Sequence, residues 1–255
     1  MSTESSSLRA PAQVHAAENF AGIYWPEAAK VLGGFLRRFR RERRRRKVGR
    51  AYDMALEMAR TIPRGSEVLD VGCGHGFIAH HLSAMLGKGV IGIDVMPATQ
   101  APIDFRRYDG RHFPAEDNSF DAVLLCYVLH HARDVHLMLN EVRRVLREDG
   151  LVIIYEDIPL TMWDRALCRI HSRRWKGRSG PCSFRNESQW PALLSAAGWE
   201  IVSARRLSRW RNLTHPVTRA SFVLQPQRPA GAIAHSAARP ANQRNQLLVS
   251  CGTEG

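Results

Sequence analysis

The chain has 255 residues, 44% of them apolar, so it is long enough for one well-buried core with spare length at both ends. It has no run of about 18 apolar residues, and its polar first residues lack the features of a signal peptide. We therefore expect no membrane span and a cytoplasmic location. The five cysteines are scattered and never spaced as Cys-x-x-Cys, which argues against a disulfide framework, and we expect no metal site.

Positive charge is concentrated in one segment of the chain. The net charge is +13, but Arg37 to Arg50 alone contains ten Lys or Arg residues and a single acid, Glu42. The remaining residues are close to electrically balanced. The high isoelectric point, about 10.4, therefore describes this basic segment rather than the body of the protein.

The N-terminal part is predicted to be helical after an unstructured start. Residues 1–25 are rich in Ser, Ala and Glu without a clear period, and we expect them to be disordered or to form a lid. Residues 26–62 form an Arg-rich helical segment in this prediction. One helix covers 26–47, where apolar residues recur on one face, and a second covers 50–61 and stops at Pro63.

Residues 63–225 show the pattern of an α/β domain, in which short apolar strands alternate with helices. The predicted strands are 68–71, 90–93, 103–107, 120–126, 151–155, 200–205 and 219–224, and the predicted helices are 77–86, 134–146 and 187–197. This order predicts a doubly wound, mostly parallel seven-stranded sheet with helices on both faces. Residues 226–255 are rich in Pro, Ala, Gln and Arg and are predicted to be a low-complexity tail.

A glycine-dense turn follows the first predicted strand. The sequence from Val68 to Gly76 runs from a buried strand into Gly72, Gly74 and Gly76 and then opens a helix. Glycines allow a tight turn and let a ligand lie against backbone N–H groups. A turn that binds nothing is the simpler alternative. The spacing differs from the Gly-x-Gly-x-x-Gly of dinucleotide dehydrogenases, because Phe stands at position 77, so a nicotinamide-dependent oxidoreductase is disfavoured.

Carboxylates follow the next two strands as well. Asp94 ends the second strand, where a carboxylate accepts hydrogen bonds from the ribose hydroxyls of an adenosine ligand. Asp109 and Gly110 follow the third strand, where they could read the edge of an adenine ring. Each has a local alternative: Asp94 could cap the next turn, and Asp109-Gly110 could form a type I turn. Together they predict one ligand at the carboxyl edge of the sheet.

At these residues the sequence resembles a known family. Val68 to Ala79 resembles the first motif of the class I S-adenosylmethionine-dependent methyltransferases, in the branch called type 11. The resemblance continues through Asp109 to Val123, Val128 to His131, and Glu141 to Gly150. It covers residues 65–157 well and 185–225 loosely. It implies a Rossmann-like methyltransferase fold, S-adenosyl-L-methionine as cofactor, and methyl transfer as the reaction.

The resemblance also implies roles for residues at the methionine end of the cofactor. Asp70 and the backbone of Gly72, Cys73 and Gly74 would hold the methionine portion. Cys126, at the end of the fourth strand, would offer its backbone carbonyl to the methionine amine.

The other implied roles concern the adenosine end. Asp94 would hold the ribose, Val95 and Met96 would pack against the adenine, and Asp109 and Gly110 would read its edge. One feature departs from the family, because only 14 residues separate Asp94 from Asp109. The usual helix between the second and third strands must therefore be very short or absent, which opens one flank of the adenine pocket.

The acceptor side is less defined. His130 and His131 follow the fourth strand and are weak candidates for a general base, which is needed only if the acceptor must lose a proton. A structural part for at least one of them is the alternative. Acceptor contacts are expected from Tyr24 to Pro26 and from the insert Ile158 to Phe184, which holds aromatic and basic residues.

The favoured function is methyl transfer to a small-molecule or lipid-like acceptor. The basic segment Arg37 to Arg50 leaves three interpretations open: contact with an anionic membrane surface, contact with nucleic acid, or a solvated helix whose apolar stripe packs on the catalytic domain. The functional alternatives are a nucleic-acid methyltransferase that uses this segment and a non-catalytic partner subunit that binds S-adenosylmethionine. Peripheral attachment to a membrane is the alternative location, and the oligomeric state is not predicted.

Overall fold

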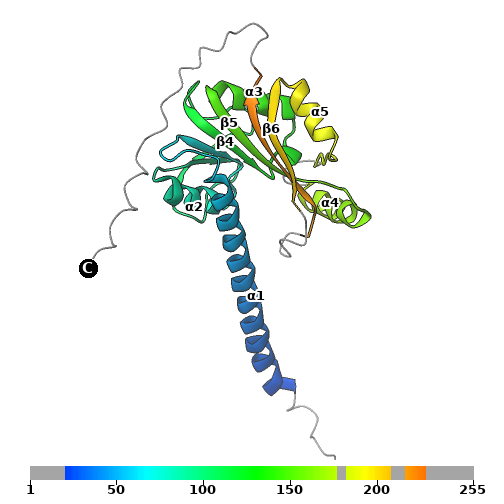
Figure 1. Ribbon diagram of the computed structural model, residues 1–255. Coiled ribbons are helices and arrows are strands. Elements are labelled where there is room, and N and C mark those ends of the chain that lie inside the picture. Colours follow the sequence, from blue (N-terminus) through cyan, green and yellow to red (C-terminus); the bar gives the residue numbers. More distant parts are fainter. Residues whose placement is uncertain (1–20, 177–181, 208–215, 228–255) are drawn as a thin grey trace, which may run out of the picture.

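The computed structural model describes residues 21–176, 182–207 and 216–227, with side chains described from residue 33 onward. Its centre is a seven-stranded sheet in the order β3-β2-β1-β4-β5-β7-β6 (Figure 1). The strands are β1 Val68–Val71, β2 Ile91–Asp94, β3 Asp104–Arg107, β4 Phe120–Cys126, β5 Leu146–Asp157, β6 Trp199–Leu207 and β7 Arg219–Pro226. The helices are α1 Ala21–Met58, α2 Phe77–Leu86, the 3-10 turn η1 Leu129–His131, α3 Val135–Val145, α4 Met162–Trp175 and α5 Gln189–Ala196.

The sheet confirms the predicted doubly wound topology. Strands β1 to β5 pair in parallel, and β7 inserts antiparallel between β5 and β6. β1 pairs with β2 on one side and with β4 on the other, so the direction of winding reverses between β1 and β4. Open α/β sheets bind their ligands at the carboxyl ends of the strands beside such a reversal.

Two hydrophobic cores cover the two faces of the sheet. Alternate residues of β4 point to opposite sides, so Val123 and Leu125 join one core while Ala122 and Leu124 join the other. The first core is closed by α3 and α5, and the second by α2 and the last turns of α1. Helices therefore cover both faces, as predicted.

Helix α1 differs from its prediction. The sequence predicted two helices, over 26–47 and 50–61, whereas one continuous helix of 38 residues runs from Ala21 to Met58. A glycine inside a helix costs about 1 kcal/mol, and Gly49 stands where the helix begins to pack on the domain. Burial of the following turns, including Met54 and Met58, outweighs that cost. Among the described helices none is long and apolar enough to cross a membrane.

The first half of α1 stands away from the sheet (Figure 1). Phe35, Leu36 and Phe39 are 65%, 44% and 52% exposed, and the basic residues around them are exposed as well. Of the three interpretations left open for the basic segment, the one in which its apolar stripe packs on the catalytic domain is contradicted by the exposure of these three residues. Residues 21–25 are helical, while residues 1–20 of the predicted disordered start and residues 228–255 of the predicted tail lie outside the described part.

The connection between β2 and β3 and the insert after β5 differ in how well the sequence predicted them. No helix lies between β2 and β3, as the short spacing predicted. The insert after β5, in contrast, forms α4, which was not predicted. Its start is a capping box in which Thr161 and Asp164 exchange hydrogen bonds, and Asp164 also accepts hydrogen bonds from Thr218 at 3.0 Å. The Thr-x-x-Asp pattern is visible in the sequence and would have located this helix.

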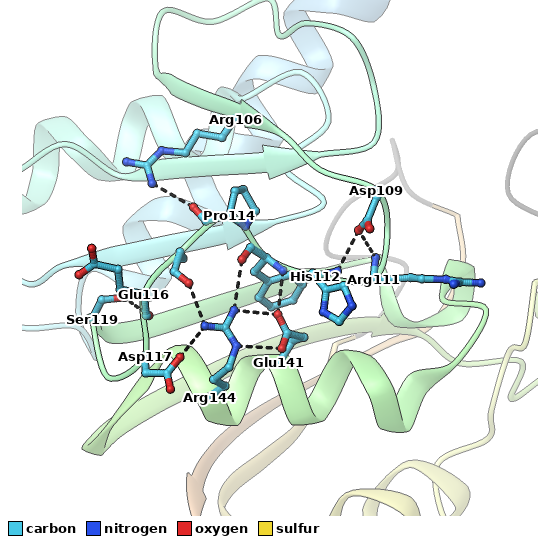
Figure 2. A network of polar contacts seen from close by, with 12 residues as sticks. Arg106, Asp109, Arg111, His112, Pro114, Glu116, Asp117, Ser119, Glu141 and Arg144 are labelled. Atoms are coloured by element: carbon cyan, nitrogen blue, oxygen red, sulfur yellow. Dashed lines mark hydrogen bonds and ion pairs between the residues drawn. The ribbon is translucent and has the colours of Figure 1, made fainter.

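The loop between β3 and β4 is fastened to α3 by a partly buried ion pair between Arg144 and Glu141 (Figure 2). Arg144 donates to both carboxylate oxygens of Glu141, at 2.9 and 2.8 Å, and to the carbonyl oxygens of Phe113 and Ala115. Glu141 also accepts a hydrogen bond from the backbone N–H of Phe113 at 2.8 Å. This loop carries Asp109, so the ion pair positions one of the predicted site residues.

Replacing Arg144 should therefore destabilise the protein more than replacing an exposed arginine. Arg144→Ala removes charge-assisted bonds to a largely buried carboxylate and should cost about 2–3 kcal/mol of unfolding free energy. The control is Arg147→Ala, which removes an exposed pair with Asp121 at 2.6 Å and should cost less than about 1 kcal/mol. Urea denaturation of both variants measures the difference, and equal losses would contradict the positioning role.

Candidate functional site

The turn after β1 is built for close approach of its backbone to a neighbour. Gly72, Gly74 and Gly76 all have positive φ, at 69°, 56° and 77°. A Cβ at residue 72 would lie 2.5 Å from Cγ2 of Val128, in the loop after β4, so only glycine fits there. Helix α2 begins directly after Gly76, so this turn and the N-terminus of α2 lie together at the carboxyl edge of the sheet.

Asp70 is a buried carboxylate at the end of β1. It is 1% exposed, and neither of its oxygens has a hydrogen-bond partner among the described residues. Burial, and next the nearby charge of Asp94, raise the pKa of Asp70 to about 7, although the nearby backbone N–H of Ala79, which does not meet hydrogen-bond geometry, acts to lower it. A buried carboxylate without partners is costly, and a cationic ligand group would relieve that cost.

A cavity of about 230 Å³ lies beside this turn. Its lining includes Asp70, the backbone from Gly72 to Gly74 and, from the end of β4, Cys126. The structure thus brings together all the residues predicted for the methionine end. Tyr127 also lines the cavity and has φ of 59°, a left-handed conformation that is uncommon for a residue with a side chain.

Helix α1 forms the remaining wall of the cavity. Lys47, Arg50, Ala51 and Met54 line it, and sequence reasoning missed all four. No local motif marks them, because their place depends on how α1 packs across the domain. The basic segment therefore extends into the candidate site.

Asp94 joins the ends of β1 and β2. Its carboxylate accepts hydrogen bonds from the backbone N–H of Gly74 at 2.8 Å and of Met96 at 2.9 Å. The bond to Met96 is the local cap that the sequence left open as an alternative, whereas the bond to Gly74 ties Asp94 to the glycine turn. A carboxylate offers about four acceptor positions, so both oxygens keep capacity for a ligand hydroxyl.

The residues predicted for the adenine end lie together but outside the lining of the cavity. Asp109 accepts hydrogen bonds from the backbone N–H groups of Arg111 and His112, at 2.7 and 2.8 Å, and these bonds lower its pKa (Figure 2). A Cβ at Gly110 would lie 3.5 Å from Cγ1 of Val95. Val95 and Met96 are 53% and 39% exposed, which agrees with the open flank predicted there.

His130 is anchored in the interior. Its Nδ1 lies 2.6 Å from Oε2 of Glu156, and the other oxygen of Glu156 accepts the backbone N–H of Leu129 at 2.8 Å. Burial acts to lower the pKa of His130, but the Glu156 carboxylate outweighs it and holds the pKa above its ordinary value. Glu156 was missed by sequence reasoning, since nothing local distinguishes it from other strand residues.

His131 has a different environment. Its Nε2 lies 3.2 Å from Nε2 of His171, and its Nδ1 lies 3.4 Å from Sγ of Cys182. Burial, and next the charges of His130 and His171, lower the pKa of His131 to about 3. Such an imidazole takes up a proton poorly at neutral pH, which weakens His131 as a general base.

A second cavity of about 240 Å³ adjoins the first and shares Arg50 and Met54 with it. Its lining holds four arginines, including Arg205 and Arg219, and two acids, Asp53 and Glu57, so basic residues predominate. Arg219, in the lining of the second cavity, donates a hydrogen bond at 3.2 Å to the phenol oxygen of Tyr127, which lines the first cavity. The expected contacts at Tyr24 and Trp25 cannot be placed, because the side chains of residues 21–32 lie outside the described part.

Comparison with known proteins places part of this chain in a family. The model of a family described as "Methyltransferase domain" matches residues 69–154, from β1 into β5. These residues contain the glycine turn, Asp94, Asp109 and both candidate histidines.

Curated relatives include enzymes of several pathways. The chain is 32% identical over 154 residues to a probable phthiotriol/phenolphthiotriol dimycocerosates methyltransferase of Mycobacterium ulcerans, covering 56% of this chain and 50% of that protein. It is 28% identical over 187 residues to a ubiquinone biosynthesis O-methyltransferase of Rhizobium etli, covering 65% and 74%. The chain thus spans only about half the length of the mycobacterial relative.

Solved structures share the fold at low identity. The cyclase SpnF superposes with a TM-score of 0.55 at 20% identity, over 71% of this chain and 82% of that one. A S-adenosylmethionine-dependent methyltransferase of Methanosarcina mazei gives 0.52 at 19% identity, over 66% and 95%. The match over residues 69–154, together with the seven-stranded sheet, identifies this part of the chain as a class I S-adenosylmethionine-dependent methyltransferase domain of the type 11 branch.

Proposed function

We propose that this protein transfers a methyl group from S-adenosyl-L-methionine to a small-molecule or lipid-like acceptor. The observation that carries the proposal is the fit between the cavity and the cofactor. Asp70 presents a buried carboxylate without a hydrogen-bond partner to a cavity whose turn tolerates no side chain at residue 72. The cofactor carries cationic groups and a narrow methionine chain, which match both features.

Residues of the chain would divide the work of holding the cofactor. Asp70 and the backbone from Gly72 to Gly74 would hold the methionine portion, with the carbonyl of Cys126 facing its amine. Asp94 would accept the ribose hydroxyls. When bound, the cofactor supplies a methyl group on a positively charged sulfur, which an acceptor displaces in line. The protein then has to orient the acceptor and exclude water, which the walls from α1 and Tyr127 would do.

The acceptor would enter from the side of the second, basic cavity. Relatives named for phthiotriol, ubiquinone and sterol substrates favour a small or lipid-like acceptor. Arg50 and Arg219 at the junction of the two cavities favour one with an anionic or strongly polar group. Turnover of such acceptors with S-adenosylmethionine, followed by mass spectrometry of the product, tests the proposal. Cofactor binding without turnover over a broad panel would instead favour a non-catalytic subunit.

Asp94 gives the most direct test of the cofactor site. Asp94→Ala removes the acceptor of two ribose hydroxyls and should weaken cofactor affinity by about 2–4 kcal/mol. Isothermal titration calorimetry measures this loss. The control is Asp104→Ala, which removes an exposed carboxylate from the neighbouring strand and should leave affinity unchanged. Unchanged affinity in folded Asp94→Ala would refute the ribose assignment.

Asp70 should make cofactor binding depend on pH. With a pKa of about 7 in the free protein, the carboxyl is protonated at lower pH and must release its proton before it can pair with a cation. Affinity should therefore fall as pH drops below 7, by up to about tenfold per unit. Titrations from pH 5.5 to 8.5 measure this slope. Asp70→Asn should bind more weakly with a flatter profile, and an unchanged slope would contradict the assignment.

We further propose that the projecting half of α1 binds an anionic membrane surface. Support comes from the exposed Phe35, Leu36 and Phe39, which lie among a row of exposed arginines. Apolar side chains beside cations suit the boundary between lipid headgroups and acyl chains, whereas nucleic-acid binding needs the charges alone. Membrane attachment would also bring the enzyme to a lipid-like acceptor.

Vesicle binding distinguishes these partners. The protein should sediment with phosphatidylglycerol vesicles and not with phosphatidylcholine vesicles. Replacing Phe35 and Phe39 together by Ser should weaken this binding at least about tenfold, because their burial is lost. The control is Val202→Ser, which removes an apolar side chain that is 56% exposed on β6. Salt-sensitive RNA binding that ignores the Phe changes, without vesicle binding, would support nucleic acid instead.

A further inference from the structure

Three histidines from two separate segments meet beyond the end of β4. His130 and His131 belong to η1, and His171 belongs to α4. One ring nitrogen of each lies within 4.8 Å of one from each of the others. The insert that carries His171 is distant in sequence, so the cluster exists only because α4 packs against the loop after β4.

Glu156 orients His130 toward this cluster. Its carboxylate lies 2.6 Å from Nδ1 of His130. In the neutral imidazole, which is the form that ligates a metal, a proton on Nδ1 donated to this carboxylate leaves the lone pair on Nε2. The His130 side chain is 1% exposed, and Nε2 is buried without a hydrogen-bond partner among the described residues. A carboxylate behind one nitrogen and an unsatisfied lone pair on the other is the arrangement found in metal-ligating histidines.

One pair of nitrogens in the cluster already has the spacing of two ligands of a small ion, and the third lies within 4.8 Å of both. Nε2 of His131 and Nε2 of His171 are 3.2 Å apart. Two imidazole nitrogens that ligate zinc at about 2.0–2.1 Å in a tetrahedron lie about 3.3 Å apart, so this separation is already that of two zinc ligands. A hydrogen bond between the two rings would also satisfy this pair, but it would leave His130 Nε2 without a partner.

The surroundings exclude solvent from part of the site. The ring centroid of Phe184 lies 4.6 Å from that of His130, and the ring of Trp175 lies 5.0 Å from that of His131. His131 also contacts Sγ of Cys182 through Nδ1 at 3.4 Å, so Nε2 is the nitrogen that faces the cluster. An apolar shell around a few convergent imidazoles strengthens metal–ligand bonds, because few waters compete for the ion.

We propose that His130, His131 and His171 bind one first-row divalent cation, with Zn²⁺ the best fit, and that Glu156 is the outer residue that positions His130. Three imidazoles favour such an ion over Mg²⁺ or Ca²⁺, which prefer oxygen. They leave a fourth position for water or for an oxygen or sulfur of a bound molecule. This proposal departs from the expectation, drawn from cysteine spacing, of no metal site, and it does not depend on the proposed methyl transfer.

Metal titration of the untagged full-length protein, stripped with a chelator, tests the site. Competition with a chromophoric chelator measures Zn²⁺ affinity, and Co²⁺ substitution reports geometry through its visible spectrum. The wild type should bind one ion per chain and give the spectrum of tetrahedral Co²⁺. His171→Ala should weaken binding at least about 100-fold, and Glu156→Gln about 10- to 100-fold with the site retained.

The matched control is His136→Ala, which removes an exposed histidine on α3 outside the cluster and should leave affinity unchanged. If His171→Ala does not fold by circular dichroism, His131→Gln decides, with the same expected loss. The proposal would be overturned if the wild type did not bind Zn²⁺, or if the wild type, His171→Ala and His131→Gln bound it with equal affinity. These titrations contain no S-adenosylmethionine, and cofactor affinity of His171→Ala, measured separately, distinguishes a failed metal site from a failed cofactor site.

Discussion

The candidate site depends on one close contact, that of Gly72 with Val128. The turn after β1 and the loop after β4 approach so closely that a Cβ at residue 72 would overlap the Val128 side chain. Because these two loops flank the reversal of winding between β1 and β4, their contact fixes the position of the Asp70 carboxylate relative to Cys126 and Tyr127. A larger residue at position 72 would push the two loops apart and so disturb the part of the cavity that they form.

Much of the domain could be predicted from the sequence because its signals are local. The strand Phe120–Cys126 and the helix Phe77–Leu86 have the predicted bounds, since each is an apolar run ended by residues that change the backbone conformation. The same holds for the glycine turn. The absence of a helix between β2 and β3 followed from the short spacing between Asp94 and Asp109 alone. These features need no knowledge of what packs against them.

What the sequence did not reveal depends on contacts between distant segments. Lys47 and Arg50 line the cavity only because α1 continues through Gly49 and crosses the domain, and no local pattern records that crossing. His171 meets His131 only after α4 packs against the loop after β4. Glu156 looks like any strand residue until its partner at His130 is known. For Asp94 the structure shows the local cap, and it adds a bond to the backbone of Gly74 that no local pattern predicts, while the ribose contact stays a prediction.

The unbroken course of α1 has a mechanical consequence. Its outer turns are exposed, while its inner turns carry Arg50 and Met54 into the walls of both cavities, and no bend separates the two parts. A rigid, continuous helix transmits displacement along its length. A binding partner that tilts the outer turns therefore also shifts the inner turns. By thermodynamic reciprocity, a molecule that braces the inner turns changes how readily the outer turns are gripped. Ligand binding in the cavities and contact of the outer turns with a partner are therefore coupled through this one helix.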